Sequence, residues 1–160
     1  MSTPTPPPGY LYKIISSTLS PLSPLPQSLE ISKMDAQDGF IHLCTSHQII
    51  NTLNAFFQAE AYVFILRIPY TLVEKHIKWE DSRGEAAYEA NGWDTSHNNN
   101  YYPHLYAQDK DVMLGENGLR LGRDQIDQVA RWERNGETWM IDGWPFPSDK
   151  PSQRNDTVVN

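Results

Sequence analysis

Three side chains from separate parts of the chain have the types needed for acid–base chemistry: His42, Glu80 and His104. A histidine can give or take a proton near neutral pH, and a nearby carboxylate can orient its ring. Each residue also has an ordinary structural interpretation, as a hydrogen-bonded strand histidine or a carboxylate at a solvated strand end. We predict that the three converge on one cleft. The two histidines would be an acid–base or hydrogen-bonding pair, and Glu80 would orient one of them.

Residues near these three could position a substrate. Thr45 and Gln48 have the spacing of a helix capping box, which would place a helix N-terminus, where backbone N–H groups gather, beside His42. Lys13 interrupts an apolar segment and could either point into the cleft or lie along the surface. The aromatic residues expected to form its walls are Tyr12, Phe40, Trp79, Trp93, Tyr102 and Tyr106. Of these, Trp79, Trp93, Tyr102 and Tyr106 are predicted, with Lys13, Thr45 and Gln48, to bind the substrate.

Hydrophobic patterns predict the elements that carry these side chains. Segments rich in β-branched and aromatic residues are expected to be strands, at residues 10–16, 40–44, 62–68, 76–80 and 101–106. Residues 62–68 form an almost continuous apolar run, which is typical of a central strand. Apolar residues recur at helical spacing from Ser46 to about Gln58, which predicts a helix there.

Two later segments are less regular. Residues 81–100 are rich in glycine and asparagine, and a loop of that length is usually a lid, a binding loop or a disordered segment. Asn135-Gly136 lies between two apolar segments, which favours a hairpin of residues 129–133 and 137–141 over a capped helix that begins at Asp124.

Length and composition indicate a single domain with flexible ends. The chain has 160 residues, of which 39% are hydrophobic and 12 are proline. These values predict a compact α+β domain at residues 10–147, preceded by a disordered proline-rich lead at residues 1–9. Residues 148–160 are expected to form a disordered tail.

Charge and cysteine content narrow the class of partner. The formal net charge is −7, and no run of Lys or Arg occurs, which argues against binding to nucleic acid or to an anionic membrane. Cys44 is the only cysteine, so an internal disulfide is excluded, and no CxxC or HExxH spacing suggests a metal site. Neither a bilayer-spanning apolar stretch nor a signal peptide is evident. We expect a cytoplasmic protein that binds a small molecule and uses neither a metal nor another cofactor.

Three segments, in order, resemble the family called Domain of Unknown Function 952. They are Asp38-Gly-Phe-Ile-His-Leu-Cys-Thr45 with Gln48, then Lys78-Trp-Glu80, then Tyr102-Pro-His-Leu-Tyr106. The resemblance extends from about Tyr10 to Trp139. It departs from the usual pattern at Cys44, where serine is commoner, and in an extended loop at residues 86–100.

The resemblance implies an ADP-ribosyltransferase-like scaffold, which is a split, mostly antiparallel pair of sheets with few helices. The Ile41-His42-Leu43 segment is also similar to the histidine motif of the RNA 2′-phosphotransferases of that scaffold. The resemblance further implies a cleft lined by Lys13, His42, Thr45, Gln48, Glu80, His104 and Tyr106. It implies no particular reaction, because fold analogy alone does not establish one.

Three functions remain open at this point. The first is a cofactor-free enzyme for a small, largely apolar metabolite, which would catalyse isomerisation, cyclisation or cycloaddition in a natural-product pathway by positioning and by hydrogen-bond or acid–base catalysis. The second is a transferase that uses NAD or a 2′-phosphate. Lys13 is the only cation within the core motifs, and phosphate binding normally needs more. The third is a binding module for a small ligand, without turnover. We favour the first.

Overall fold

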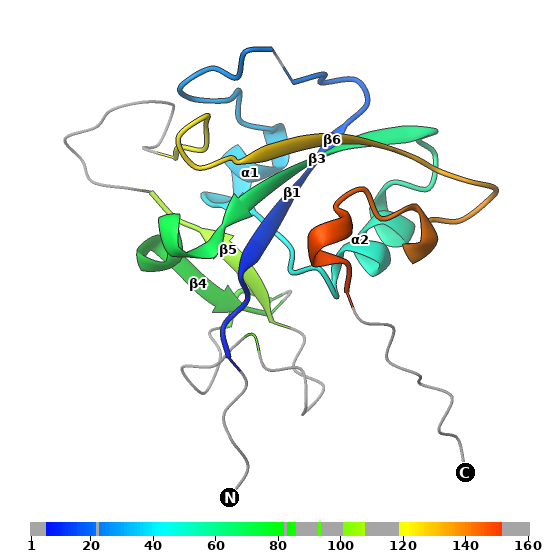
Figure 1. Cartoon of the computed structure of the whole chain (residues 1–160). Helices are drawn as coiled ribbons and strands as arrows, with labels where there is room; N and C mark the ends of the chain where they lie inside the picture. The colour runs from blue at the N-terminus through cyan, green and yellow to red at the C-terminus, as the bar shows by residue number, and fades with distance from the viewer. Residues whose placement is uncertain are drawn as a thin grey trace, which may run out of the picture.

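Two antiparallel three-stranded sheets make up the β-structure of the protein (Figure 1). The computed structural model describes residues 6–21, 23–81, 83–85, 93, 101–107 and 119–151. The first sheet has the order β1-β3-β6, formed by β1 (Tyr10–Ser16), β3 (Tyr62–Pro69) and β6 (Gln128–Glu133). The second has the order β2-β5-β4, formed by β2 (Ile41–His42), β5 (Tyr102–Leu105) and β4 (Ile77–Glu80). This architecture confirms the predicted α+β class and the split antiparallel sheet.

The helices in the described ranges are short. They are α1 (Lys33–Asp38), α2 (Ile49–Phe56) and 3-10 turns at Tyr70–Leu72, Glu74–His76, Ile141–Gly143 and Pro147–Asp149. None of the helices that the structure describes is long and apolar enough to cross a lipid bilayer.

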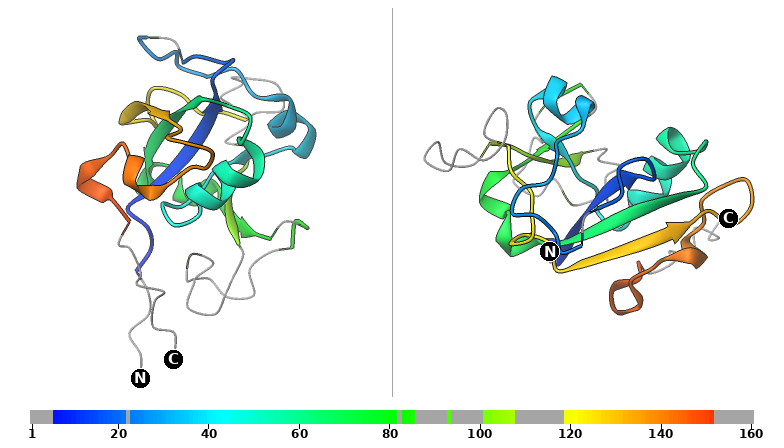
Figure 2. Two further views of the ribbon diagram at one scale, coloured as in Figure 1. Left: turned by 90° about the vertical axis from the view of Figure 1, so that its right-hand side faces the viewer. Right: turned by 90° about the horizontal axis from the view of Figure 1, so that it is seen from above.

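The two faces of the first sheet cover separate hydrophobic cores. Figure 2 shows the strands of this sheet from two further directions. The core between the two sheets includes Leu11, Leu66 and Ile68 from the first sheet and Ile41, Trp79 and Leu105 from the second. The core on the opposite face joins the first sheet to α2 and to the C-terminal segment, through Tyr12, Ile65, Leu53, Trp132, Trp139 and Phe146. The first sheet is therefore the central layer of the molecule.

β3 is the central strand of the first sheet, as its apolar run predicts. It pairs with β1 along one edge and with β6 along the other, and Val63, Ile65, Leu66 and Ile68 are fully buried. Within the described ranges, β1 has a partner strand on one side only. Its other edge makes one isolated antiparallel bridge, between Tyr12 and Cys44.

Several predicted boundaries were wrong. The helix expected from Ser46 begins at Ile49, because residues 46–48 form a turn in which the N–H of Gln48 donates to the carbonyl of Thr45 at 3.1 Å. His76, expected in a strand, lies in a 3-10 turn before β4. The strand expected at residues 40–44 is only the pair Ile41–His42, with Cys44 in the separate bridge.

The predicted hairpin at Asn135-Gly136 was also wrong in its second half. Its first strand exists, as β6, but that strand pairs with β3. The segment after Gly136 packs on α2 instead, because the side chain of Asn54 forms two hydrogen bonds with the backbone of Trp139, at 2.8 and 3.1 Å. The ring of Trp139 is buried in the core beside Trp132.

The C-terminal end of the described chain contacts the first sheet. Arg67 on β3 forms ion pairs with Asp127 and Asp149, each at 2.9 Å, and the hydroxyl of Tyr12 donates a hydrogen bond to Asp149. The packed region thus includes Asp149, two residues beyond the expected domain boundary. Residues 1–5 and 152–160, and most of the predicted loop at 81–100, lie outside the described residues, so the expectations for them stay predictions.

Gly122 allows two loop segments to pack against each other. The N–H of Leu29 donates to the carbonyl of Leu121 at 2.8 Å, and the N–H of Arg123 donates to the carbonyl of Pro26 at 3.0 Å. A Cβ atom on Gly122 would lie 1.8 Å from the carbonyl oxygen of Gln27 and 2.4 Å from its carbonyl carbon. Residue 122 therefore has no space for a side chain unless the backbone moves.

Gly122→Ala is expected to destabilise the fold by about 2–4 kcal/mol, because the clash is with backbone atoms. Urea unfolding measures the change, and Gly9→Ala is the matched control because a Cβ at Gly9 meets nothing within 4 Å. Equal stability of the two variants would contradict this account of the loop contact.

Candidate functional site

The histidines predicted to converge are direct cross-strand partners. His42 on β2 pairs with His104 on β5, and their ring centroids lie 5.5 Å apart. Side chains alternate along a strand, so the face of the second sheet that carries these rings also carries Lys78 and Glu80 of β4, while Leu105 and Ile41 point into the core. The antiparallel register therefore brings together residues that are 24 to 62 positions apart in the chain.

His104 is held by a buried carboxylate. Its Nδ1 lies 2.9 Å from Oε1 of Glu80, and the hydroxyl of Tyr106 donates to the same oxygen at 2.6 Å. The ring of Phe40 stacks on His104 with centroids 4.0 Å apart. Burial lowers the pKa of His104 below its ordinary value, and this effect outweighs the opposing influence of Glu80.

These contacts define the protonation state of His104. The ring is neutral at pH 7, with its Nδ1–H donated to Glu80, so Nε2 carries the lone pair. No hydrogen-bond partner for Nε2 occurs among the residues that the structure describes. Burial and the hydrogen bond to Glu80 raise the pKa of Tyr106 to about 12, so Tyr106 remains a hydrogen-bond donor. His104 thus has the arrangement of a general base with an orienting carboxylate.

The tautomer of His104 is open to direct measurement. Long-range ¹H–¹⁵N NMR spectra at pH 7 are expected to show the Nδ1-protonated form, with a titration midpoint below the ordinary value of 6.5. In Glu80→Gln the midpoint is expected to fall further, because the charge of Glu80 favours the protonated ring. A midpoint at or above 6.5 in the wild-type protein would contradict the assignment.

His42 contacts two carboxylates, both from the α1 region. Its Nδ1 lies 2.6 Å from Oδ1 of Asp35, and its Nε2 lies 3.0 Å from Oδ2 of Asp38. Each ring nitrogen of His42 is therefore within hydrogen-bonding distance of one carboxylate oxygen. The side chain of Asp35 is 3% exposed and that of Asp38 is 46% exposed, so the contact with Asp38 is the one open to solvent.

Asp35 also binds Lys13. The ammonium group of Lys13 lies 2.7 Å from Oδ2 of Asp35 and 3.1 Å from the backbone carbonyl of His42. Burial alone would raise the pKa of Asp35, but the hydrogen bonds from His42 and the charge of Lys13 outweigh it and lower that pKa to about 2. Lys13 thus lies at the cavity, with its charge balanced by Asp35.

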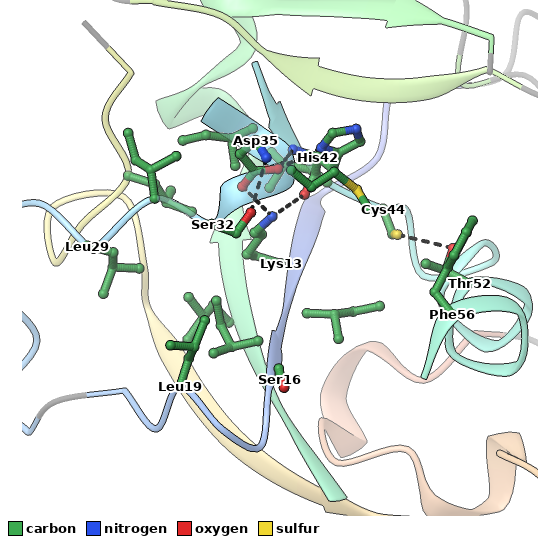
Figure 3. Close-up of a pocket in the computed structure, with 18 of the residues that line it drawn as sticks. Lys13, Ser16, Leu19, Leu29, Ser32, Asp35, His42, Cys44, Thr52 and Phe56 are labelled. Carbon is green, nitrogen blue, oxygen red and sulfur yellow. Dashed lines mark hydrogen bonds and ion pairs between the residues drawn. The ribbon is translucent and has the colours of Figure 1, made fainter. Parts of the chain in front are cut away.

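A cavity of about 980 Å³ opens beside these groups (Figure 3). Lys13, Asp35 and His42 gather at one part of it, with His104 and Tyr102 also among its lining residues. Much of the remaining lining is apolar and includes Ile14, Leu19, Leu29, Met34 and Phe56. The cavity therefore combines a polar, titratable region with an apolar region large enough for a substantial small molecule.

Some predicted site residues lie elsewhere. Trp79 points into the core between the sheets, because it alternates with Lys78 and Glu80, and its indole packs on Tyr70 and Trp93. The aromatic-wall prediction was therefore wrong for Trp79, and it was wrong for Tyr12, which packs in the other core. The ring of Trp93 contacts the ring of Trp79, and Trp93 does not line the cavity.

Thr45 and Gln48 shape the chain but do not line the cavity. The side-chain oxygen of Gln48 accepts from the N–H of Thr45 at 3.0 Å, which is one half of the predicted capping box. The other half is not formed, since the buried hydroxyl of Thr45 has no hydrogen-bond partner among the described residues. Ile49 and Ile50, at the start of α2, are also not part of the lining, whereas Asn51, Thr52 and Phe56 are.

Two site residues were not singled out from the sequence: Asp35 and Asp38. A signal was available, because Ser32 and Asp35 have the spacing of a helix N-cap followed by an acidic residue. In the structure the hydroxyl of Ser32 accepts from the N–H of Asp35 at 3.1 Å. Gly39 ends α1 in the left-handed conformation, with φ +79°, and so turns the chain toward β2.

The described residues offer limited means of holding a metal or a phosphate. No group of three or more His, Cys, Asp or Glu side chains in the described ranges is placed to bind a metal ion. Lys13 is the only Lys or Arg side chain among the described residues that line the cavity. Burial raises the pKa of the Cys44 thiol, so this group is protonated and poorly nucleophilic.

Comparison with known proteins gives a family and a fold. The family model "Protein of unknown function (DUF952)" matches residues 25–115. A crystal structure of protein CC0527 from Caulobacter crescentus is 24% identical, covers 81% of this chain and 91% of its own, and superposes with a TM-score of 0.55. The solution NMR structure of CC0527 is 23% identical, with coverages of 83% and 93% and a TM-score of 0.56. No curated protein matches this chain.

Proposed function

The chain belongs to the DUF952 family, and we propose that this member is a cofactor-free enzyme that isomerises or cyclises a small, largely apolar carbonyl compound by proton transfer. The observation that carries the proposal is the facing pair of imidazoles, each with its own carboxylate, beside a cavity of about 980 Å³. Two imidazoles that face each other can act on one substrate as a proton acceptor and a hydrogen-bond donor.

In the proposed reaction His104 is the base. Its Nε2 removes a proton from the carbon next to the substrate carbonyl, and the charge of Glu80 stabilises the imidazolium that forms. The C–H electron pair moves into the adjacent carbon–carbon bond, and the carbonyl oxygen gains negative charge. When the carbonyl compound is β,γ-unsaturated, the enolate is conjugated with its second double bond. His104 then returns the proton to the γ-carbon, which gives the α,β-unsaturated isomer.

His42 is the proposed donor to the oxygen. The substrate oxygen replaces the half-exposed carboxylate of Asp38 and accepts a hydrogen bond from Nε2–H of His42. Asp35 and Lys13 are positioning residues, because they fix the ring through Nδ1 and the backbone carbonyl. A cyclisation or cycloaddition of a natural-product precursor would use the same donor and the same apolar walls for positioning.

The charge of the cavity favours an uncharged substrate over NAD or a 2′-phosphate. Its lining includes Glu30, Asp35, Asp38 and Asp81, against the single ammonium of Lys13. An acidic surrounding repels phosphate groups and offers them no bidentate guanidinium. The ADP-ribosyltransferase-like scaffold therefore stays a hypothesis about ancestry, and nucleotide transfer stays the alternative function.

Proton exchange in D₂O tests the proposal before the natural substrate is known. A panel of apolar ketones is incubated with the protein, and deuterium uptake next to the carbonyl is followed by NMR. We expect faster uptake for at least one ketone, and stabilisation against heat by that ketone but not by NAD or ADP-ribose. Stabilisation by NAD without deuterium uptake would favour the transferase. Ketone binding without uptake would favour a non-catalytic binding module.

A further inference from the structure

The open edge of β1 presents the backbone N–H and C=O of Ile14 to the cavity. Leu11, Lys13 and Ile15 direct their backbone groups toward β3. The N–H of Tyr70 donates to the carbonyl of Gly9, so the backbone groups of Gly9 point toward β3. In an antiparallel pair every second residue points the same way, so Leu11, Lys13 and Ile15 do so too. The backbone groups of Tyr12 and Ile14 must then point the other way, and Tyr12 does so in its two 2.8 Å hydrogen bonds with Cys44.

Ile14 lacks the partner that Tyr12 has. If the bridge between Tyr12 and Cys44 continued, antiparallel pairing would place His42 opposite Ile14. His42 pairs instead with His104 in the other sheet, and its carbonyl accepts from the ammonium of Lys13 at 3.1 Å. The two segments therefore separate after one bridge, and the cavity lies where they part.

On this edge the carbonyls of Tyr12 and Ser16, on either side of Ile14, already accept hydrogen bonds. The carbonyl of Ser16 accepts from the N–H of Leu19 at 2.9 Å, which closes the edge after Ile14. Within the part of the chain that the structure describes, neither the N–H nor the C=O of Ile14 has a hydrogen-bond partner. Ile14 itself lines the cavity, so these two groups face whatever fills it.

The surroundings of Ile14 are apolar. Leu19, Met34 and Phe56 line the same cavity and are 46%, 55% and 74% exposed. Figure 3 shows Leu19 and Leu29 on one side of β1 and Phe56 on the other. An apolar ligand that covers these side chains displaces water from the N–H and C=O of Ile14. Each of these two groups weakens binding if the ligand leaves it without a hydrogen-bond partner.

We infer that the cavity binds an uncharged, apolar molecule that contains an aminoacyl unit, whose own N–H and C=O complete an antiparallel bridge with Ile14. One residue of an antiparallel pair exchanges both hydrogen bonds with one residue of its partner, so the ligand needs its donor and its acceptor on the same unit. The excess of acidic groups in the lining disfavours a free carboxylate, so the unit is capped or cyclic. This inference rests on the proposed function and names the substrate class of its site.

The test uses the ¹⁵N-labelled full chain and two probes of nearly equal shape. The first probe is N-benzoyl-leucine N′-methylamide. The second replaces the leucine N–H by an ester oxygen and so lacks only the donor. We expect the amide to shift the Ile14 N–H signal and slow its hydrogen exchange, and the ester to bind about tenfold more weakly. Equal affinity of the two probes, or an Ile14 N–H unchanged at saturation, would overturn the inference.

A variant gives a second, independent reading. Ile14→Pro removes the N–H on the open side of an edge strand, where proline is tolerated. It is expected to weaken binding of the amide probe about tenfold with a retained spectrum for β3 and β6. His47→Gln, at an exposed residue outside the cavity lining, should leave probe binding unchanged. Loss of probe binding with intact ketone exchange would therefore refute only the aminoacyl inference, whereas intact binding without any exchange would refute only the proposed reaction.

Discussion

Replacing His104 with glutamine is expected to lower the rate of ketone deuterium exchange by about 10²–10⁴-fold, which is the usual contribution of a positioned acid–base group. Glutamine can still donate a hydrogen bond to Glu80 but cannot accept a proton at pH 7. Ketone affinity should change little, because the apolar walls formed by Leu29 and Phe56 remain. The expected kinetic signature is therefore a loss in kcat rather than in KM.

Two further variants make this expectation specific. His47→Gln is the matched control, because His47 is exposed and is not among the residues that line the cavity, and it should keep the wild-type rate. Tyr106→Phe removes one of the two donors to Glu80 and should cause a smaller loss than His104→Gln. A His104→Gln protein that is folded and exchanges ketones at the wild-type rate would show that His104 is not the base.

Asp35→Asn is expected to be the most destabilising of the polar substitutions, by about 3–5 kcal/mol. The change leaves the ammonium of Lys13, which is 11% exposed, without its carboxylate. It also removes the acceptor charge for His42. Urea unfolding at pH 7 measures the loss, and Asp142→Asn, at an exposed aspartate, is the matched control.

The same substitution makes a prediction about pH. The pKa of Asp35 is about 2 in the folded protein and 3.8 in its ordinary state, so its ionised form stabilises the fold by about 2 kcal/mol above pH 4. That contribution is lost as the pH falls from about 4 toward 2. The stability difference between the wild-type protein and Asp35→Asn should shrink over that range.

A double variant separates charge burial from simple loss of a contact. Lys13→Met combined with Asp35→Asn leaves no unpaired ammonium, so it should be less destabilised than Asp35→Asn alone. A double variant less stable than the single one would mean that the ion pair is not the source of the effect.

The parts of the fold that follow from local pattern could be predicted from the sequence. β1 and β3 have strong β-branched and apolar runs, and both form the strands that those runs predict. Side-chain alternation, applied to β4, would have placed Trp79 in the core. Its assignment to the site came from its aromatic type rather than from its register.

Long-range pairing decided what local pattern could not. The Asn135-Gly136 signal favoured a hairpin, but β3 was the available partner for β6, and Asn54 held Trp139 on α2 instead. The role of Asp35 depends on a short helix whose cap spacing was visible, yet its contact with Lys13 joins separate elements. Propensity and spacing carry no information about such contacts.

The most direct test of the central claim is the pH dependence of ketone exchange. If His104 is the base, activity falls on the acid side with a midpoint below 6.5, equal to the midpoint of the His104 ring in NMR titration. Both midpoints should move lower together in Glu80→Gln, because the carboxylate that favours the protonated ring has lost its charge. Two results would contradict the account. One is a midpoint of activity loss that differs from the NMR midpoint of His104, and the other is a midpoint of activity loss that does not change in Glu80→Gln.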